Sequence, residues 1–248
     1  MNKKVTVLIP CYNEAGNIGR VIKGFSKSPL VQNAFDLDIL VIDNNSADGT
    51  ADIARAAGAR VITEKRQGKG FAVRTGFQNI HPQAEYVVML DGDDTYKPEE
   101  VLRLLEPIHH DFCDVVVGSR LGGKMSEHSM PFGNRGFNWL CVHLVRYFYG
   151  ANVTDALSGY YAWKKDVVES LVPYLDAAGF ALEMEMITKM ARMKFEMYSM
   201  PISYRKRLSG TGIHPLDSIP ILQMFFKNLR WSPRATETVR THESPVEV

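Results

Sequence analysis

Short, continuous apolar runs alternate with helix-like segments through the first half of the chain, and this alternation limits the fold more than any other feature. Runs that are apolar throughout are typical of strands buried on both faces of a parallel sheet. Strands that alternate with helices predict a mainly parallel α/β sheet covered on both faces. We expect strands at Val5–Ile9, Asp38–Ile42, Arg60–Thr63, Tyr86–Leu90, Val115–Val117 and Glu196–Ile202. We expect helices at Asn17–Phe25, Ala51–Ala57, Phe71–Ile80, Pro98–Leu105, Phe137–Phe148 and Phe180–Met193.

Composition sets the broad class of protein. Of 248 residues, 45% are hydrophobic and 23% are charged, which is ordinary for a globular domain with a full core. A net charge of +1 gives no basic field of the kind that nucleic-acid-binding domains show. No apolar run approaches the roughly 18 residues of a membrane span. We expect residues 1–230 to form one domain and the polar residues 231–248 to form a disordered tail.

Three carboxylates follow one of the apolar runs, where Tyr86–Leu90 is succeeded by Asp91, Gly92, Asp93 and Asp94. Ligands of open α/β sheets bind just beyond the carboxyl ends of the strands. Carboxylates clustered there favour Mg²⁺ or Mn²⁺, because such ions are held by one or two carboxylates plus the phosphates of a substrate. The sequence therefore predicts a metal-bound diphosphate at Asp91 and Asp93. A polar Asp-Gly turn is the alternative interpretation.

Two further loops follow predicted strands and carry groups suited to a nucleoside. After the first strand, Pro10 ends the run, Tyr12 offers an aromatic face for a base, and Glu14 offers a hydrogen-bond acceptor. After the second strand, Asp43 is placed to accept a proton from a base or ribose. Asp48 is more typical of a turn that begins a helix. A plain strand-to-helix connection is the alternative for the first of these loops.

A basic, glycine-rich loop, Arg66-Gln67-Gly68-Lys69-Gly70, follows the third predicted strand. Its glycines allow close backbone approach, and its two cations, Arg66 and Lys69, suit phosphate. The loop lacks the Walker spacing, and no dinucleotide glycine fingerprint follows the first strand, which argues against ATPases and dehydrogenases. Because all of these loops follow strands of one parallel sheet, we expect them at one edge, and this convergence favours the metal interpretation.

Seven short motifs occur in a fixed order along the chain: Val7–Glu14, Val41–Thr50, Gly68–Gly70, Leu90–Asp93, Val117–Arg120, Asp155–Tyr160 and Tyr204–Gly210. In this order they resemble the motifs of family 2 inverting glycosyltransferases with the GT-A fold. Within that family the match leans to polyprenyl-phosphate sugar synthases of the dolichol-phosphate mannose synthase type. The resemblance covers about residues 4–230. It implies a Rossmann-like, mainly parallel sheet flanked by helices, with a C-terminal amphipathic helix.

The resemblance also implies a role for each matching position. Asp91 and Asp93 would form the Asp-x-Asp pair that carries the metal and the diphosphate. Mannose synthases often carry a glutamine where this chain has Thr95, so the third metal ligand and the sugar stay open. The nucleoside would be held by Pro10, Tyr12, Glu14 and Asp43. The basic residues near the transferring phosphates would be Arg120, Arg135 and Arg207.

The implied reaction is displacement at the anomeric carbon of the sugar by a lipid phosphate, with inversion. A phosphate monoester is largely ionised near neutral pH, because its second pKa is about 6, so it needs little help from a general base. Arginines must instead hold it in line. Asp155 either faces the acceptor or caps the turn that follows it. We expect catalysis to depend on Asp93, Asp155, Arg120 and Arg207.

Two glutamates, Glu183 and Glu185, lie in the apolar segment Leu182–Met186. An acceptor that reacts through a hydroxyl would need a base, and Glu183 is then the candidate. The alternative for this segment, above all for Glu185, is a solvated helix face.

The C-terminal part of the predicted domain, residues 201–230, is basic and amphipathic. Between Pro201 and Arg234 lie six Lys or Arg residues and one acidic residue. An apolar stripe runs beside them, made of Ile219, Ile221, Leu222, Phe225, Phe226 and Leu229. A short basic amphipathic helix can lie in a membrane interface, and packing on the core is the alternative. A second apolar surface, for which core packing is the expected account, consists of Phe137, Leu140, Val145 and Phe148.

The leading hypothesis is a metal-dependent hexosyltransferase that moves a sugar from a UDP- or GDP-sugar to dolichyl or undecaprenyl phosphate. We expect it in the cytoplasm, peripherally attached to the cytoplasmic face of a membrane, directly or through a membrane protein, and without nucleic acid. Its three distant cysteines fit a reducing compartment. The alternatives are a glycosyltransferase with a saccharide hydroxyl acceptor, a sugar-nucleotide pyrophosphorylase and a non-catalytic binding module. The pyrophosphorylase would need a glycine- and arginine-rich loop after the first strand, which Pro10–Asn13 is not.

Overall fold

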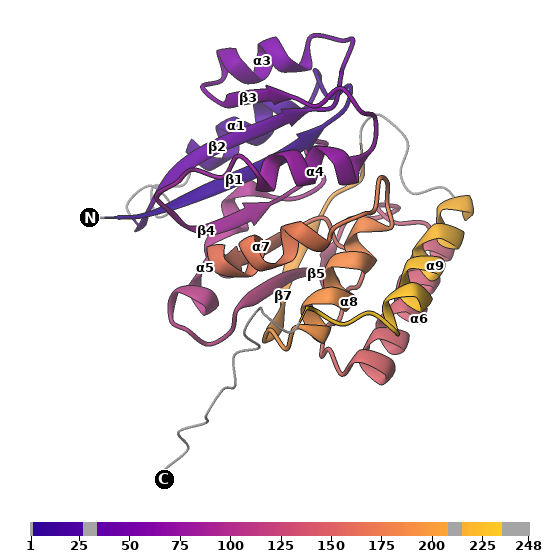
Figure 1. Ribbon diagram of the computed structural model, residues 1–248. Coiled ribbons are helices and arrows are strands. Elements are labelled where there is room, and N and C mark those ends of the chain that lie inside the picture. Colours follow the sequence, from indigo (N-terminus) through magenta and orange to yellow (C-terminus); the bar gives the residue numbers. More distant parts are fainter. Residues whose placement is uncertain (1, 27–33, 208–214, 235–248) are drawn as a thin grey trace.

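Seven strands form one sheet in the computed structural model, which describes residues 2–26, 34–207 and 215–234. The spatial order is β3-β2-β1-β4-β6-β5-β7 (Figure 1). The strands are β1 (Lys3–Cys11), β2 (Phe35–Asp43), β3 (Arg60–Thr63), β4 (Ala84–Met89), β5 (Val115–Met125), β6 (Tyr161–Lys164) and β7 (Met197–Tyr204). Neighbouring strands run parallel except β6, which is antiparallel to both β4 and β5. The predicted mainly parallel sheet is therefore confirmed.

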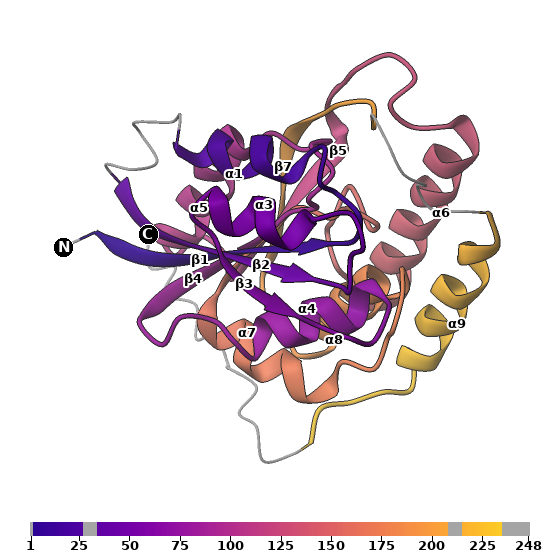
Figure 2. The same cartoon turned by 90° about the horizontal axis from the view of Figure 1, so that it is seen from above.

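Helices cover both faces of this sheet (Figure 2). One face carries α1 (Ile18–Ser26), α3 (Thr50–Ala56) and α5 (Val101–His109). The other carries α4 (Lys69–Phe77), α7 (Lys165–Leu171) and α8 (Leu182–Arg192). Successive strand residues point to opposite faces, so Val7 and Ile9 of β1 join one apolar cluster and Leu8 between them joins the other. Burial on both faces explains why the strands read as continuous apolar runs.

The second half of the chain holds two elements that the sequence pattern did not predict, β6 and α7. β6 has only four residues, and an apolar run of that length shows no periodicity that identifies a strand. It lies inside the sheet between β4 and β5, where Trp163 stacks on Tyr161 with ring centroids 5.0 Å apart. Three short 3-10 turns complete the described elements, at Pro98–Glu100, Val172–Tyr174 and Pro215–Asp217.

Two helices lie side by side at one end of the molecule, α6 (Phe132–Tyr149) and α9 (Ser218–Asn228) (Figures 1 and 2). The Tyr149 hydroxyl donates to the Phe225 carbonyl, and the Phe148 ring meets the Phe225 ring at 5.7 Å. The predicted C-terminal helix is present as α9, and its predicted apolar stripe is divided, since Phe225 is buried and Phe226 is exposed. Within the ranges that the structure describes, no helix is both long and apolar enough to span a bilayer.

The end of the described chain stays in contact with the domain. The Trp231 ring lies 5.1 Å from the Tyr174 ring, and the Arg234 amide donates to the Tyr174 hydroxyl. The chain is therefore ordered by packing as far as Arg234. The predicted disordered tail falls mostly on residues 235–248, which lie outside the described residues.

Candidate active site

The loops that follow β1, β2 and β4 meet at one edge of the sheet, as expected. β1 pairs with β2 up to the position where Cys11 is opposite Asp43. Pro10 lies inside β1, so the strand continues one residue beyond it. The loop after β4 crosses the end of β1 so closely that a Cβ on Gly92 would come 2.4 Å from the Cys11 sulfur. The carboxylates after β4 therefore lie beside the ends of β1 and β2.

Side-chain caps join the loop after β1 to the loop after β2. The Asn13 Oδ1 accepts from the Ala47 amide at 2.9 Å, and Asp48 accepts from the Ala15 amide at 2.9 Å. Asp48 also caps its own turn, which agrees with the structural interpretation of this residue. Tyr12 stays 51% exposed on the joined loops. Its ring is thus available as a stacking surface for a base.

Asp43 is the buried carboxylate of this edge. Only 4% of the residue is exposed, and its Oδ2 receives one long contact, 3.4 Å from the Ser46 amide. Its Oδ1 is buried and has no hydrogen-bond partner within the described ranges. A buried polar atom without a partner is costly, and an N–H donor from a ligand would remove that cost. The position suits the predicted nucleoside contact.

Asp91 and Asp93 each hold a cation from another part of the fold. Lys69 Nζ lies 2.6 Å from an Asp91 oxygen, and Arg207 lies 2.7 Å from an Asp93 oxygen. Lys69 begins α4, and Arg207 follows β7. Both cations were expected at phosphates, and the structure places them at the aspartate pair.

Two glutamates share these cations. Glu183, in the first turn of α8, lies 2.7 Å from Lys69 Nζ, and Glu14 lies 3.5 Å from Arg207. Four carboxylates thus surround two cations, which leaves excess negative charge among these groups. Such an excess attracts a divalent cation. The expected contact of Glu14 with a base edge stays a prediction.

Burial changes the acid–base properties of these groups. Burial raises the pKa of Asp93, and the nearby Asp91 carboxylate raises it further, against the opposing effect of Arg207. Burial likewise raises the pKa of Glu14. For Lys69, burial favours the neutral amine, but Asp91 and Glu183 outweigh it and raise the pKa, so Lys69 is an ammonium at neutral pH. Lys69 therefore contributes a permanent positive charge to the site.

Two hydrogen bonds from Thr95 hold the Asp93 carboxylate in position. The Thr95 hydroxyl and amide donate to Asp93 Oδ1 at 2.6 and 3.1 Å, and the intervening Asp94 adopts a left-handed conformation with φ 61°. In the described ranges no set of three or more His, Cys, Asp and Glu side chains is arranged to hold a metal. The pair nevertheless fits Mg²⁺ or Mn²⁺, since such ions take one or two carboxylates and complete their shell with phosphate oxygens and water.

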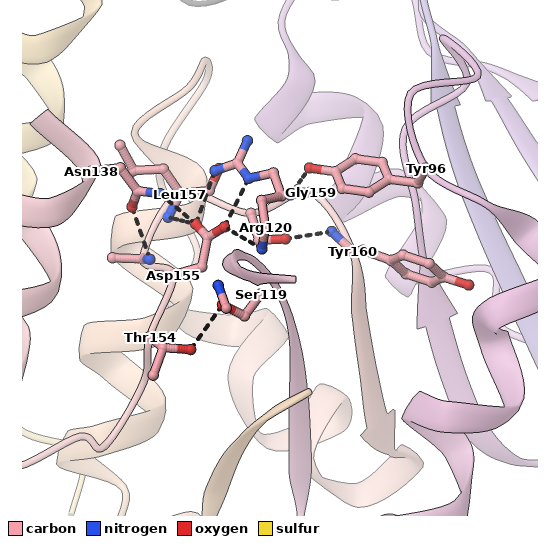
Figure 3. Close-up of polar contacts among 12 residues, drawn as sticks. Tyr96, Ser119, Arg120, Asn138, Thr154, Asp155, Leu157, Gly159 and Tyr160 are labelled. Atoms are coloured by element: carbon pink, nitrogen blue, oxygen red, sulfur yellow. Dashed lines mark hydrogen bonds and ion pairs between the residues drawn. The ribbon is translucent and has the colours of Figure 1, made fainter. Parts of the chain in front are cut away.

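Arg120 and Asp155 form a buried ion pair (Figure 3). Asp155 is fully buried, and its carboxylate accepts from Arg120 Nε at 2.8 Å and from Asn138 Nδ2 at 2.7 Å. It also accepts from the Leu157 amide at 3.2 Å, which is the turn-capping alternative that the sequence left open. Burial by itself raises the pKa of Asp155, but Arg120 outweighs it and the pKa is lowered. Asp155 is therefore a buried carboxylate that anchors the following loop.

The loop after Asp155 packs directly against Asp91 through Gly159. A Cβ on Gly159 would come 2.2 Å from Asp91 Oδ2, so only glycine fits there without displacing the aspartate. The Gly159 amide donates to the Tyr96 hydroxyl at 2.8 Å (Figure 3). Arg120 lies over the Tyr204 ring, 5.3 Å from its centroid. A direct role of Asp155 and Arg120 on the acceptor stays a prediction.

Two other basic residues expected at the phosphates make different contacts. The Arg66 guanidinium is held by Glu64 at 2.8 and 3.0 Å and lies over the Phe71 ring. Arg135 lies on the exposed side of α6, and nowhere in the described chain does its side chain form an ion pair with Asp91 or Asp93. Their phosphate contacts stay predictions.

The solvated-face interpretation of Glu185 was wrong. Glu185 is fully buried, accepts from the amides of Asp176 and Ala177, and pairs with Lys189 at 2.7 Å. The spacing along the chain gave no sign of this burial, because Glu185, Thr188, Lys189 and Arg192 recur at the interval that is typical of a polar helix face. The pairing of Asp94 with Arg20 at 3.0 Å was also missed, because the two residues are far apart in the chain.

Comparison with known proteins identifies one family, and three similar proteins are named as sugar transferases. The family model described as Glycosyl transferase family 2 matches residues 6–172. Glycosyltransferase AglJ of Haloferax volcanii is 34% identical over 214 residues, 86% of this chain and 67% of its own. A dolichyl-phosphate hexose transferase of the same organism is 30% identical and covers 85% and 87% of the two chains. An undecaprenyl-phosphate mannosyltransferase of Micrococcus luteus is 28% identical and covers 84% and 86%.

A solved structure shows the same fold. Glucosyl-3-phosphoglycerate synthase from Mycobacterium tuberculosis, crystallised with Mn²⁺ and uridine-diphosphate-glucose, superimposes with a TM-score of 0.73 over 92% of this chain and 79% of that one. The two sequences are 22% identical, so this likeness speaks for the fold alone. With the family match over residues 6–172, it confirms the resemblance seen in the motifs: the chain belongs to glycosyl transferase family 2 and has a GT-A-type α/β fold.

Proposed function

We propose that this protein transfers a hexose from a nucleotide-sugar to a polyprenyl phosphate, with inversion at the anomeric carbon. The observation that carries the proposal is the pair Asp91 and Asp93, each matched with a cation, beside the buried Asp43. The names of two relatives support the acceptor class, since one is a dolichyl-phosphate and the other an undecaprenyl-phosphate transferase.

On the donor side, Asp43 and Tyr12 would bind the nucleoside. The unpartnered Asp43 Oδ1 would accept an N–H of the base, and the exposed Tyr12 ring would stack on it. Both uracil and guanine carry a suitable N–H, so this contact fits a UDP- or a GDP-sugar.

At the diphosphate, Asp91 and Asp93 would hold Mg²⁺ or Mn²⁺, which when bound acts as a Lewis acid and template for the leaving group. A protein of the same fold was crystallised with Mn²⁺ and uridine-diphosphate-glucose. Lys69 and Arg207 would then bind the phosphate oxygens of the donor. Arg207 can present two parallel N–H donors to a phosphate, and Lys69 acts as a compact charge.

On the acceptor side, a phosphate nucleophile suits this site because it needs no base. Glu183 is the base candidate for a hydroxyl acceptor, and one of its oxygens forms an ion pair with Lys69 at 2.7 Å. Burial raises the pKa of Glu183, although Lys69 opposes this, and that raised pKa is the observation that favours a hydroxyl acceptor as the second candidate.

We also propose that the exposed side of α6 and α9 meets the membrane in which the acceptor lipid lies. This α6–α9 face consists of Phe132, Trp139, Leu140, Tyr147, Phe148, Ile219 and Phe226. Phe132 is 92% and Tyr147 is 84% exposed, so core packing does not account for them. Neither helix contains an acidic residue, Arg135 and Arg146 add positive charge, and Lys227 is paired with Asp176 at 2.9 Å. Aromatic and basic side chains without acids suit the interface of an anionic cytoplasmic leaflet.

The test is incubation of the purified protein with polyprenyl phosphate, Mn²⁺ and each of a panel of radiolabelled UDP- and GDP-sugars. The proposal predicts a product that partitions into organic solvent and releases sugar in mild acid. A matched reaction with Asp93→Asn, checked for an unchanged melting curve, serves as the control. A water-soluble glycoside formed on a saccharide would support the hydroxyl-acceptor alternative, and transfer to neither class of acceptor would contradict the proposal.

A further inference from the structure

Lys69 bridges two carboxylates that do not contact each other in any other way among the described residues. Its ammonium lies 2.6 Å from Asp91 Oδ1 and 2.7 Å from Glu183 Oε1. Asp91 follows β4, whereas Glu183 lies in the first turn of α8. Lys69 is thus placed with one acceptor at the aspartate pair and a second acceptor deeper in the fold.

A divalent cation on Asp91 would compete with Lys69 for the same carboxylate. Lys69 already contacts Asp91 Oδ1, and Gly159 packs closely against the same carboxylate, since an added Cβ would come 2.2 Å from Oδ2 and 3.0 Å from Oδ1. Two positive charges on one carboxylate repel each other strongly where little water screens them. Lys69 must therefore weaken its contact with Asp91 when the metal binds.

We propose that Glu183 is a positioning residue that receives Lys69 when a divalent cation takes Asp91. This inference rests on the metal site of the proposed function. Glu183 is suited to the role because its side chain is only 6% exposed and already contacts the ammonium, so Lys69 keeps a full charge partner without leaving the site. Held on Glu183, the ammonium remains beside the diphosphate position. Glu183 thereby favours metal binding without touching the metal.

The neighbouring Glu185 supplies a matched control. It lies in the same helix, is fully buried, and pairs with Lys189 at 2.7 Å. Its other partners are the amides of Asp176 and Ala177, and neither Asp91 nor Asp93 is among them. Glu185→Gln therefore removes a buried, lysine-paired carboxylate from α8 without changing the partners of Lys69.

The experiment measures Mn²⁺ affinity of the full chain without nucleotide, by the loss of the free-Mn²⁺ electron paramagnetic resonance signal. Glu183→Gln is expected to weaken binding by about tenfold, because Lys69 then has Asp91 as its one charged acceptor. Glu183→Asp, which keeps the charge, should retain more affinity than Glu183→Gln. Glu185→Gln should leave the affinity unchanged. Melting curves confirm that each variant is folded.

A double-mutant cycle with Lys69→Met decides whether Glu183 acts through Lys69. In the Lys69→Met background, Glu183→Gln should change Mn²⁺ affinity by less than about twofold. An equal, roughly tenfold loss in both backgrounds would show a direct effect of Glu183 on the metal and overturn the inference. Absence of saturable Mn²⁺ binding by the wild-type chain would overturn both the metal site and the inference. Binding by the wild type with an additive cycle would overturn the inference alone.

Discussion

Neutralising Asp155 tests the claim that the Arg120–Asp155 pair anchors the loop whose Gly159 packs against Asp91. Asp155→Asn keeps the size of the side chain but leaves the buried Arg120 guanidinium, 6% exposed, without its counter-ion. Breaking a buried ion pair in this way costs about 3–5 kcal/mol. For a domain of this size each kcal/mol lowers the melting temperature by about 2–4 °C, so we expect a decrease of roughly 6–20 °C.

The assay is thermal unfolding and urea unfolding, each followed by circular dichroism, with Asp52→Asn as the matched control. Asp52 also pairs with an arginine, Arg55, at 2.8 Å, but its side chain is 86% exposed. Neutralising an exposed pair costs about 0–1 kcal/mol. If Asp155→Asn were no more destabilising than Asp52→Asn, the anchoring role of Asp155 would be refuted.

The pH dependence of the free energy of unfolding is a second test of the anchoring role of Asp155. Burial disfavours the ionised Asp155, but Arg120 and Asn138 outweigh it, so the folded pKa lies below the ordinary carboxyl value. A depressed folded pKa stabilises the protein above the unfolded pKa, and this contribution is lost as the pH falls towards the folded value. Asp155→Asn should therefore flatten the loss of stability on acidification.

Asp93→Asn should lower turnover by at least about a hundredfold while the fold is retained, as steady-state transfer rates would show; near-normal turnover would contradict the metal site. Trp139→Ser with Phe226→Ser should reduce flotation with anionic liposomes, whereas Phe112→Ser, which removes an aromatic ring 63% exposed and outside the α6–α9 face, should not; equal flotation of both variants would count against the face. Arg66 lowers the pKa of Glu64 to about 2, so Glu64 stabilises the fold above its ordinary pKa and this is lost as the pH falls towards 2. Glu64→Gln should therefore lose less stability than the wild type between pH 6 and pH 3 in urea titrations, and identical losses would contradict this.

The local pattern of the sequence was sufficient to place every strand except β6, together with the groups at the strand ends. β3 has the predicted bounds, and β4 ends one residue before the predicted end. Because strands buried on both faces read as continuous apolar runs, the residues that follow them could be assigned to one edge before any contact was known. Asp43, Asp91 and Asp93 were found in this way.

The partners of these groups could not be predicted, because they come from distant parts of the chain. Nothing near Lys69 in the sequence indicates that it lies on Glu183, and that contact exists only because α4 and α8 cover the same face of the sheet. The Arg120–Asp155 pair likewise joins β5 to a loop after α6. Spacing along the chain describes local periodicity, and it does not describe which helix covers which strand.

We propose that Asp91 and Asp93 hold a divalent metal at the donor diphosphate and that Asp43 binds the base. The most direct test is a crystal structure with Mn²⁺ and a nucleoside diphosphate, UDP or GDP, at saturating concentration. We expect Mn²⁺ density between the two aspartates and the phosphates, Lys69 withdrawn from Asp91 Oδ1, and a base N–H on Asp43 Oδ1. A nucleotide bound with Lys69 and Arg207 still on the aspartates and no Mn²⁺ between them would contradict the account.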